Sequence, residues 1–314
     1  GSTVSGTMPP MQPAIETVDL VKRYGRTTAL AGLSMRVEPG EVFGFLGPNG
    51  AGKTTSVKLF LGLARATSGH GTLLGAPLGD RATRRRVGYL PELFRYQPWL
   101  RAREVLALHC ALAGIEPRER IVEIATALET VGLADRADDL VGAFSKGMQQ
   151  RLGLGVALLG RPELVLLDEP TSALDPVGRA DVRRIIRAAR ERGTTVFLNS
   201  HLLSEVELVC DRVAVVDAGR VVAAGTLEEL LGEDSVRVHV TGLDPAARAG
   251  LVRFGPLTDD GDWLAIQPIA ADRIPELIAA IVAAGGRVHA VQPGRASLEE
   301  RFLGLVHETE LSGR

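Results

Sequence analysis

Cysteine is scarce in this chain of 314 residues, where it occurs only as Cys110 and Cys210. Both lie within apolar helical patterns, which favours two small core residues over a disulfide or a metal-binding pair. No uncharged run approaches the ~20 apolar residues of a membrane-spanning helix, and nothing near residue 1 resembles a signal peptide. These absences predict a protein of a reducing compartment with no membrane span of its own.

Neither sign of charge dominates, because 36 Lys and Arg residues stand against 38 Asp and Glu residues, a net charge of −2. This balance gives no reason to expect nucleic acid or an anionic membrane as the main partner. Hydrophobic content of 45% is typical of globular proteins, and the length predicts about two domains. Residues 1–13 are small, polar and proline-rich, so we expect a flexible leader there, in part a cloning remnant.

One glycine-rich loop organises the chain, and it reads Gly47-Pro48-Asn49-Gly50-Ala51-Gly52-Lys53-Thr54-Thr55. The apolar run 42–46 before the loop predicts a buried strand. The apolar spacing in 56–64 after the loop predicts a helix. A strand, a glycine loop and a helix in this order are the context that a phosphate-binding loop requires.

Each part of this loop suits a phosphate group. Glycines let backbone N–H groups turn inward, and the N-terminus of the following helix adds a favourable dipole. Lys53 supplies a positive charge, and Thr54 offers a hydroxyl to Mg²⁺. The other lysines are Lys22, Lys58 and Lys146, so chance is a poor explanation for a lysine at this spacing. The sequence therefore predicts nucleotide binding rather than a glycine-rich turn with an accidental lysine.

The segments on either side of the loop also follow clear patterns. β-Forming residues in 14–21 and 28–37 predict an antiparallel strand region before it, with a turn at Tyr24-Gly25. Two roles are open for Tyr24, whose ring either stacks on an adenine base or is an ordinary turn aromatic. After the loop, the basic run 81–86 is most simply a solvated helix face.

A helical insert is predicted within about 98–161. It carries two apolar stripes with helical spacing, which are Val105, Leu106, Leu108 and Leu112, then Ile121, Ile124, Leu128 and Val131. Inside it, the segment 145–151 reads Ser-Lys-Gly-Met-Gln-Gln-Arg and enters a helix over 152–159. Two roles are open for Ser145, because a serine at a helix entry either caps the helix or helps to hold a phosphate.

Acidic residues and a histidine follow two predicted buried strands. The apolar strand 163–167 ends in Asp168 and Glu169, and the strand 194–198 leads to His201. Ligands of α/β sheets bind at this carboxyl edge, so Asp168 suits Mg²⁺ and Glu169 suits the polarisation of an attacking water. The alternatives are a solvated pair of charges and a histidine that only caps a helix.

Taken together, these motifs resemble the nucleotide-binding subunit of an ABC transporter, over residues 15–231. The resemblance rests on the order and spacing of Tyr24, Gly47 to Thr54, Glu92, Ser145 to Gln149, Asp168-Glu169, Ser172 to Asp175 and His201. It implies that Tyr24 stacks on adenine and that Lys53 contacts the β- and γ-phosphates. It also implies that Thr54 and Asp168 bind Mg²⁺, that Glu169 is the base, and that His201 senses the γ-phosphate.

The resemblance assigns three sets of site residues. The catalytic set is Glu169, His201 and Glu92, and the metal set is Thr54, Asp168 and Glu92. The ATP-binding set is Tyr24, Gly47, Pro48, Asn49, Gly50, Ala51, Gly52, Lys53, Thr54, Thr55, Ser145, Gly147 and Gln149. A head-to-tail dimer is implied as well, a homodimer or a heterodimer with a related ATPase, in which Ser145 and Gly147 close over ATP on the opposite subunit.

Two departures from the family pattern stand out. Glu92 occupies the position of the usual glutamine, and an ionised glutamate only accepts hydrogen bonds, so coordination of the metal and water changes there. The usual signature Leu-Ser-Gly-Gly-Gln is replaced by the segment from Phe144 to Met148. Together with Tyr89-Leu90-Pro91-Glu92, it looks most like the ABC-2-type exporter branch, whose ATPase and permease are separate polypeptides. That branch includes drug, antibiotic-resistance and sodium efflux systems.

The remaining chain predicts a second, smaller domain. A hairpin turn at 217–220 and the exit segment 225–232 end an ATP-binding domain that spans 14–231. Beyond it we expect strands at 236–240, 263–266 and 287–291, a helix at 274–284, and a final helix that carries Leu298, Phe302 and Leu305. The predicted fold is thus α/β, a P-loop ATPase core with an antiparallel β subdomain and a helical insert, plus a small α+β domain at 232–314.

The function implied is that of an ATP-hydrolysing motor subunit with ATP and Mg²⁺ as cofactors. It would drive a separate transmembrane permease from the cytoplasmic face of the cell membrane. The alternative is a soluble ABC-type ATPase of translation or DNA repair. A single phosphate loop and the lack of a long heptad run favour the motor subunit. The permease would form the substrate path, so the substrate is not predicted.

Overall fold

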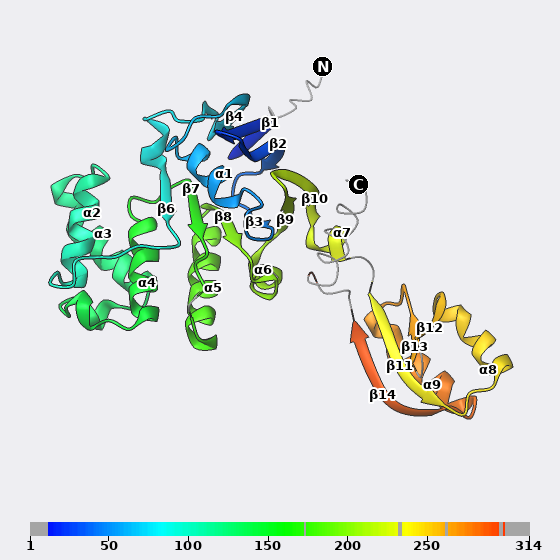
Figure 1. Ribbon diagram of the computed structural model, residues 1–314. Coiled ribbons are helices and arrows are strands. Elements are labelled where there is room, and N and C mark those ends of the chain that lie inside the picture. The colour runs from blue at the N-terminus through cyan, green and yellow to red at the C-terminus, as the bar shows by residue number, and fades with distance from the viewer. Residues whose placement is uncertain (1–11, 173, 232–233, 261–262, 295–297, 299–314) are drawn as a thin grey trace, which may run out of the picture. The chain divides into compact units, whose positions relative to one another are not determined.

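The computed structural model describes residues 12–172, 174–231, 234–260, 263–294 and Leu298 (Figure 1). The chain divides into two compact units, Gly1–Ala224 and Gly225–Arg314. The predicted leader therefore falls almost entirely outside the described residues, and the predicted domain boundary at 231 stays a prediction.

Among the described helices, none combines the length and the apolar character that crossing a membrane requires.

A six-stranded sheet with the order β10-β9-β3-β8-β7-β6 forms the centre of the first unit. Its strands are β3 (Val42–Leu46), β6 (Val87–Leu90), β7 (Leu164–Asp168), β8 (Thr195–Ser200), β9 (Arg212–Asp217) and β10 (Arg220–Thr226). From β9 to β6, neighbouring strands run parallel. Every residue of β3, β7 and β8 is buried, as expected for a parallel sheet covered on both faces. Their carboxyl ends meet at one edge, where the predicted site residues begin.

The first unit also contains the predicted antiparallel region, a four-stranded sheet with the order β2-β1-β4-β5. Its strands are β1 (Ile15–Tyr24), β2 (Thr27–Val37), β4 (Ser68–Leu73) and β5 (Ala76–Pro77). Ile15 pairs with both Val37 and Leu73, so β1 lies between β2 and β4, and its buried residues are Ile15, Thr17 and Leu20. The prediction of strands before the glycine loop is confirmed.

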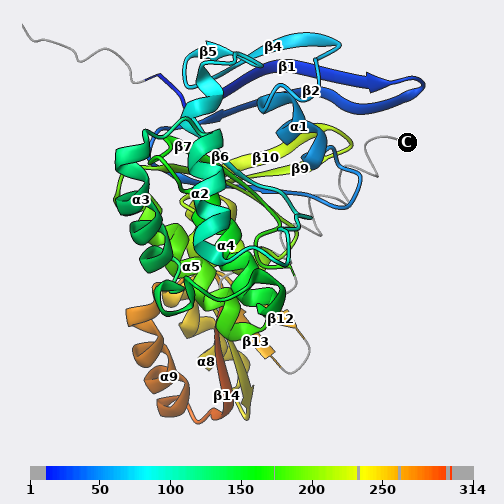
Figure 2. The same ribbon diagram turned by 90° about the vertical axis from the view of Figure 1, so that its left-hand side faces the viewer.

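Helices α2, α3 and α4 pack side by side on the β6 side of the sheet (Figures 1 and 2). The helices of this unit are α1 (Lys53–Phe60), α2 (Ala102–Leu112), α3 (Pro117–Thr130), α4 (Lys146–Ala157), α5 (Pro176–Glu191) and α6 (Leu203–Val209). The two predicted stripes do fall on α2 and α3, where Val105 and Leu128 are buried and Leu108, Leu112 and Ile121 are exposed. Neighbouring elements cover α2 and α3 on one side only. An apolar stripe that is wider than the covered side therefore has some of its residues exposed to solvent.

Phe197 of β8 lies at the centre of the core. Its ring is 6.1 Å from that of Phe43, 5.2 Å from that of Phe45 and 5.5 Å from that of Phe60. Each such pair adds about 0.5–1.5 kcal/mol beyond the burial of its area. The cluster fixes β3 and α1 against β8. Because β3 and α1 flank the glycine loop, the cluster also fixes the two ends of that loop. Cys110 and Cys210 are buried free thiols, as predicted.

The second unit contains a four-stranded sheet with the order β12-β13-β11-β14. Its elements are α7 (Leu227–Leu231), β11 (Ser235–Thr241), α8 (Pro245–Gly250), β12 (Leu257–Asp260), β13 (Trp263–Ile266), α9 (Ile274–Ala283) and β14 (Arg287–Gly294). Val236 and Val238 of β11 pack with Leu277 and Ile281 of α9 in its core. β12 is not predicted, because three of its four residues are polar. The final helix predicted around Phe302 lies outside the described residues, except for Leu298, which is buried.

Candidate functional site

The glycine loop connects β3 to α1, and close packing requires two of its glycines. A Cβ built on Gly47 would lie 2.2 Å from the Val216 carbonyl oxygen. One built on Gly52 would lie 2.5 Å from the Ala29 carbonyl oxygen, and Gly52 has a φ of 102°. Gly50 also has a positive φ of 86°, but a Cβ there would meet nothing within 4 Å. The loop is thus fixed at both ends, and its middle faces open space.

Lys53 is the first residue of α1, and its side chain is buried across the loop. Its Nζ donates hydrogen bonds to the carbonyl oxygens of Gly47 at 2.6 Å and Pro48 at 3.2 Å. Burial lowers the pKa of Lys53, while the negative charges of Glu169, Asp168 and Glu92 act to raise it. The Lys53 side chain thus contacts the glycine loop, and three carboxylates act on its charge. Thr54 follows it, exposed in the first turn of α1.

Asp168 ends β7 and is buried, with 2% of its surface exposed. Nδ2 of Asn199, its register partner on β8, donates a hydrogen bond to Oδ1 of Asp168. Burial raises the pKa of Asp168, and the charges of Glu92 and Glu169 raise it further, against the opposing effects of Asn199 and Lys53. The site therefore holds more negative charge than its own residues neutralise, which suits a divalent cation.

Mg²⁺ prefers hard oxygen ligands, and the Asp168 carboxylate and the Thr54 hydroxyl are of that kind. Within the described residues, no group of three or more His, Cys, Asp or Glu side chains is arranged to hold a metal ion. Protein-bound Mg²⁺ commonly takes one or two carboxylates, with substrate phosphates and waters completing its octahedron. The residues present fit Mg²⁺ bound together with a nucleotide, rather than a closed protein-only site.

Glu169 follows Asp168 and has a left-handed backbone, with a φ of 52°. Its backbone N–H donates to the Asn199 carbonyl oxygen at 2.9 Å, which holds the turn against β8. Its Oε2 lies 2.8 Å from Nδ1 of His201, the residue that follows β8. That contact lacks hydrogen-bond geometry, so this buried oxygen accepts no hydrogen bond from any described residue. A buried carboxylate oxygen with its acceptor capacity unused is suited to bind and polarise a water.

Glu92 follows β6 and is exposed, yet its charge reaches the same sheet edge. It acts on Lys53 and Asp168, as described above, and on Tyr89. Burial, together with the charges of Asp168 and Glu92, raises the pKa of Tyr89 to about 12. The structure thus brings together Lys53, Glu92, Asp168, Glu169 and His201, all predicted from sequence.

Tyr24 is not brought into contact with this cluster. It ends β1 and is half exposed, and Nζ of Lys22 lies 4.6 Å from the centre of its ring. In the described part of the chain, no hydrogen bond or ring contact joins Tyr24 to the glycine loop. Its role in binding adenine stays a prediction.

Ser145, Gly147 and Gln149 also lie apart from the loop in the described chain, with no hydrogen bond to it. Oγ of Ser145 accepts a hydrogen bond from the Met148 backbone N–H at 3.2 Å, so Ser145 does cap α4. Nε2 of Gln149 donates to the Phe144 carbonyl oxygen at 3.2 Å. Beside this segment lies an open cavity of about 390 Å³, which Ser145 and Gly147 line.

Asn199 is a site residue that sequence reasoning missed. It is buried at the end of β8, where its side chain binds Asp168 and its carbonyl oxygen binds Glu169. Its Oδ1 accepts no hydrogen bond from any described residue. The sequence does contain a signal for this role, an asparagine at the end of an apolar strand. Burying its side-chain amide is costly unless the amide has a hydrogen-bond partner.

A glycine loop between a buried strand and a helix, with a buried lysine and an acidic pair ending a parallel strand, defines a P-loop ATPase. The parallel sheet and the separate antiparallel sheet of the first unit agree with that class.

Comparison with known proteins places the chain within this class. Residues 30–172 match the protein family described as ABC transporter. An ABC transporter ATP-binding protein of Nostoc sp. (strain PCC 7120) is 41% identical over 95% of this chain and 91% of its own length. The bacitracin transport ATP-binding protein BcrA of Bacillus licheniformis is 42% identical over 67% of this chain and 69% of its own. The linearmycin resistance ATP-binding protein LnrL of Bacillus subtilis is 34% identical over 94% and 99%, respectively. The chain belongs to the ABC transporter ATP-binding proteins.

Solved structures show the same fold. An ATP-binding subunit of an ABC transporter is 30% identical, with a TM-score of 0.63 over 69% of this chain and 91% of that one. A dimeric ATP-binding cassette in a post-hydrolysis state, bound to ADP and Pi, is 23% identical, with a TM-score of 0.61 over 68% and 99%. The second likeness concerns the fold alone. The chain is an ABC-type ATPase that binds ATP, which confirms the class and fold predicted from its motifs.

Proposed function

We propose that this chain is the ATP-hydrolysing motor subunit of a membrane exporter whose permease is a separate polypeptide. The observation that carries the proposal is the cluster of Lys53, Asp168, Glu169 and His201 at one edge of the parallel sheet. The similarity to a bacitracin transport protein and a linearmycin resistance protein supports export of an antibiotic. The motor would act from the cytoplasmic face of the membrane, bound there through the permease.

Nucleotide binding would begin at the glycine loop. Lys53 would exchange its contacts with the Gly47 and Pro48 carbonyl oxygens for the β- and γ-phosphates, whose charge balances its buried ammonium group. Backbone N–H groups from the loop to Thr55 would line the phosphates, since the first N–H groups of α1 have no partner within the helix. Mg²⁺, when bound through Thr54 and Asp168, would neutralise phosphate charge and orient the γ-phosphate.

Hydrolysis would depend on Glu169. Its Oε2, buried and without a hydrogen bond from the described residues, would accept a proton from a water that attacks the γ-phosphate. His201 lies against that oxygen and, being half exposed, is placed to reach the γ-phosphate as well. Glu92 adds negative charge on the opposite side of Asp168, where it would modulate how strongly Mg²⁺ is held.

A head-to-tail dimer would complete the site. Ser145 and Gly147 lie apart from the glycine loop of their own chain, at the N-terminus of α4. An N-terminus of a twelve-residue helix attracts anions, so this segment would meet the γ-phosphate held by a second subunit. Gln149 would support the segment through its bond to Phe144, and Tyr24 would stack on the adenine.

The permease would contact the outer surface of the helical insert. Leu93 is 88% exposed and Trp99 is 68% exposed, both in the segment that joins Glu92 to α2. At the other end of α2, Tyr89, His109 and Leu112 line a groove of about 350 Å³. Large exposed apolar residues favour a protein contact. Photocrosslinking from position 99 in the assembled transporter should capture the permease, and crosslinks confined to the second unit would contradict this contact.

The dimer and the catalytic role of Glu169 are tested together. Glu169→Gln preserves the size of the side chain but removes a useful base, so turnover should fall by about 10²–10⁴-fold while ATP still binds. The variant should then move from monomer to dimer on a sizing column with ATP but not with ADP. Adding Ser145→Arg should restore the monomer. An elution position that ignores nucleotide, in a folded variant that binds ATP, would contradict the dimer.

A further inference from the structure

Helix α6 (Leu203–Val209) is a short helix beside the site and depends on its neighbours for stability. It begins directly after His201 and Leu202, has seven residues, and lacks a side-chain cap at its N-terminus. Helices shorter than about 12–15 residues are marginally stable alone, so the position of α6 depends on its neighbours. Whatever fixes its first turn also fixes the backbone that carries His201.

An ion pair fixes that first turn. Nη1 of Arg183, on α5, donates to both carboxylate oxygens of Glu205, at 2.9 and 2.7 Å. The Glu205 side chain is 9% exposed and that of Arg183 is 23% exposed, so water screens the pair poorly. The Glu205 backbone N–H donates to the Leu202 carbonyl oxygen at 3.1 Å, one residue beyond His201. The anchored Glu205 therefore lies in the first turn of the helix that follows His201 and Leu202.

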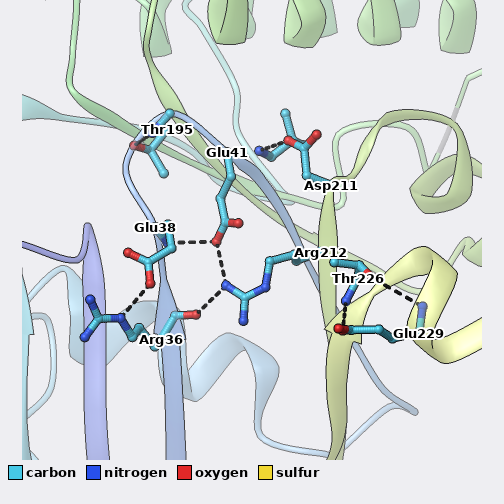
Figure 3. A network of polar contacts seen from close by, with 10 residues as sticks. Arg36, Glu38, Glu41, Thr195, Asp211, Arg212, Thr226 and Glu229 are labelled. Carbon is cyan, nitrogen blue, oxygen red and sulfur yellow. Dashed lines mark hydrogen bonds and ion pairs between the residues drawn. The ribbon is translucent and has the colours of Figure 1, made fainter. Parts of the chain in front are cut away.

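The far end of α6 is held separately. Nη2 of Arg187 donates to the Leu208 carbonyl oxygen at 2.8 Å, and Nη2 of Arg190 donates to Oδ1 of Asp211 at 2.6 Å. Oδ2 of Asp211 accepts a hydrogen bond from the Val42 backbone N–H at 2.8 Å, which ties this end to β3. Figure 3 shows Asp211 in that contact, near the pair formed by Arg212 and Glu41. The two ends of α6 are thus held by different arginines of α5.

We propose that Arg183 and Glu205 are positioning residues for hydrolysis, which set the approach of His201 to Glu169. The proposal rests on the proposed function of this site. Neither residue belongs to the loop that would bind ATP, so their effect would pass through the first turn of α6. Removal of Arg183 would leave a buried carboxylate without its cation, and the first turn would move to hydrate it. The 2.8 Å approach of Nδ1 of His201 to Oε2 of Glu169 would then be lost.

The test compares two arginines of α5 in the full chain. Arg183→Ala should lower kcat by about tenfold to a hundredfold, because displacement by about 1 Å has that effect on a catalytic group. The Kd for ATP, measured with Mg²⁺-ATP by calorimetry, should change by less than about threefold, as expected when only the transition state loses an interaction. Arg187→Ala is the matched control, since it removes one of the two arginine contacts at the far end of α6, and its kcat should stay within about twofold of the parent.

Two further variants separate positioning from folding. Arg183→Lys keeps the charge but not the shape of the guanidinium group, so its kcat should lie between those of the parent and Arg183→Ala. The exchanged pair, Arg183→Glu with Glu205→Arg, should recover part of the kcat that Arg183→Glu alone loses. Thermal denaturation identifies the folded variants, and the comparison uses those alone.

Three outcomes would overturn the proposal. They are an equal loss of kcat in Arg183→Ala and Arg187→Ala, a weaker Kd with an unchanged kcat, and a normal kcat in both Arg183→Ala and Arg183→Lys. Glu169→Gln is measured in parallel. If it retains full turnover, the proposed function fails. If it is inactive while the Arg183 variants are normal, only the positioning proposal fails.

Discussion

Gly44 and Val206 touch so closely that no larger residue fits at position 44 without moving its neighbours. A Cβ built on Gly44 would lie 2.8 Å from Cγ1 of Val206 and 2.8 Å from Cγ1 of Val213. Gly44 is in the middle of β3, which leads into the phosphate loop, and Val206 is in α6, which follows His201. The contact therefore sets the distance between the strand that leads into the glycine loop and the helix that follows His201.

We expect Gly44→Ala to displace α6 and to lower both stability and turnover. Overpacking of a buried contact costs about 1–3 kcal/mol in the free energy of unfolding. Denaturant unfolding and steady-state ATPase assays measure the two effects. Val206→Ala in the same chain should recover only part of the loss, because it removes the clash with Val206 but leaves the one with Val213. Gly250→Ala is the control, because a Cβ there meets nothing within 4 Å and should leave both quantities nearly unchanged. A fully active Gly44→Ala protein would show that α6 moves without consequence.

Lys53→Ala should abolish hydrolysis and sharply weaken ATP binding. The substitution removes the buried cation placed between the glycine loop and the carboxylates. Loss of one preorganised electrostatic contact lowers kcat by at least about a hundredfold. Lys58→Ala is the matched control, since Lys58 is exposed on the same helix. Nucleotide binding by calorimetry and phosphate release are the measurements, and normal values for Lys53→Ala would refute the assignment of the site.

Glu92→Gln should keep much of the turnover but require more Mg²⁺ to reach it. An amide removes one negative charge that acts on both Lys53 and Asp168, so the site attracts the cation less strongly. The ATPase rate is titrated with Mg²⁺ at constant ATP for the two proteins. Identical titrations would mean that the exposed Glu92 side chain does not act on the metal.

Asp168→Asn should make the protein without nucleotide more stable and abolish its response to Mg²⁺-ATP. Burial raises the pKa of Asp168, so the folded state binds the proton more tightly than the unfolded state does. Stability is therefore lost as the pH rises from the unfolded pKa through the folded pKa, and the deficit persists at neutral pH. The gain in melting temperature should be larger at pH 8 and should shrink as the pH falls through the folded pKa toward the unfolded pKa. A less stable variant at pH 8 would contradict this account.

The parts of the site predicted from sequence are those whose chemistry is local or follows from strand direction. Gly47 to Lys53 form one continuous loop, so their spacing alone indicates a phosphate site. Asp168 ends one predicted buried strand and Glu169 follows it, while His201 follows another, and the carboxyl ends of parallel strands meet at one edge. β7 and β8 accordingly begin and end close to the predicted strands 163–167 and 194–198.

The parts that sequence reasoning missed depend on packing between distant segments. The role of Asn199 requires the register that sets it opposite Asp168, and the pair of Arg183 and Glu205 requires α5 to lie against α6. The apolar spacing of Leu112 and Ile121 predicts a helix correctly, but it does not show how much of that helix its neighbours cover. Periodicity identifies elements, whereas partners across elements follow only from the assembled fold.

Because Glu169 has a left-handed backbone, selection for folding alone and selection for transport should favour different residues at position 169. A residue other than glycine held at a φ of 52° costs about 1–2 kcal/mol, and glycine avoids that cost. In a library randomised at this codon, a screen for folding alone should therefore enrich glycine, although it has no carboxylate. A screen for survival that depends on transport should retain glutamate. Related chains that bind ATP but no longer hydrolyse it are thus expected to carry glycine at this position. A glycine there would identify the inactive subunit of a heterodimer.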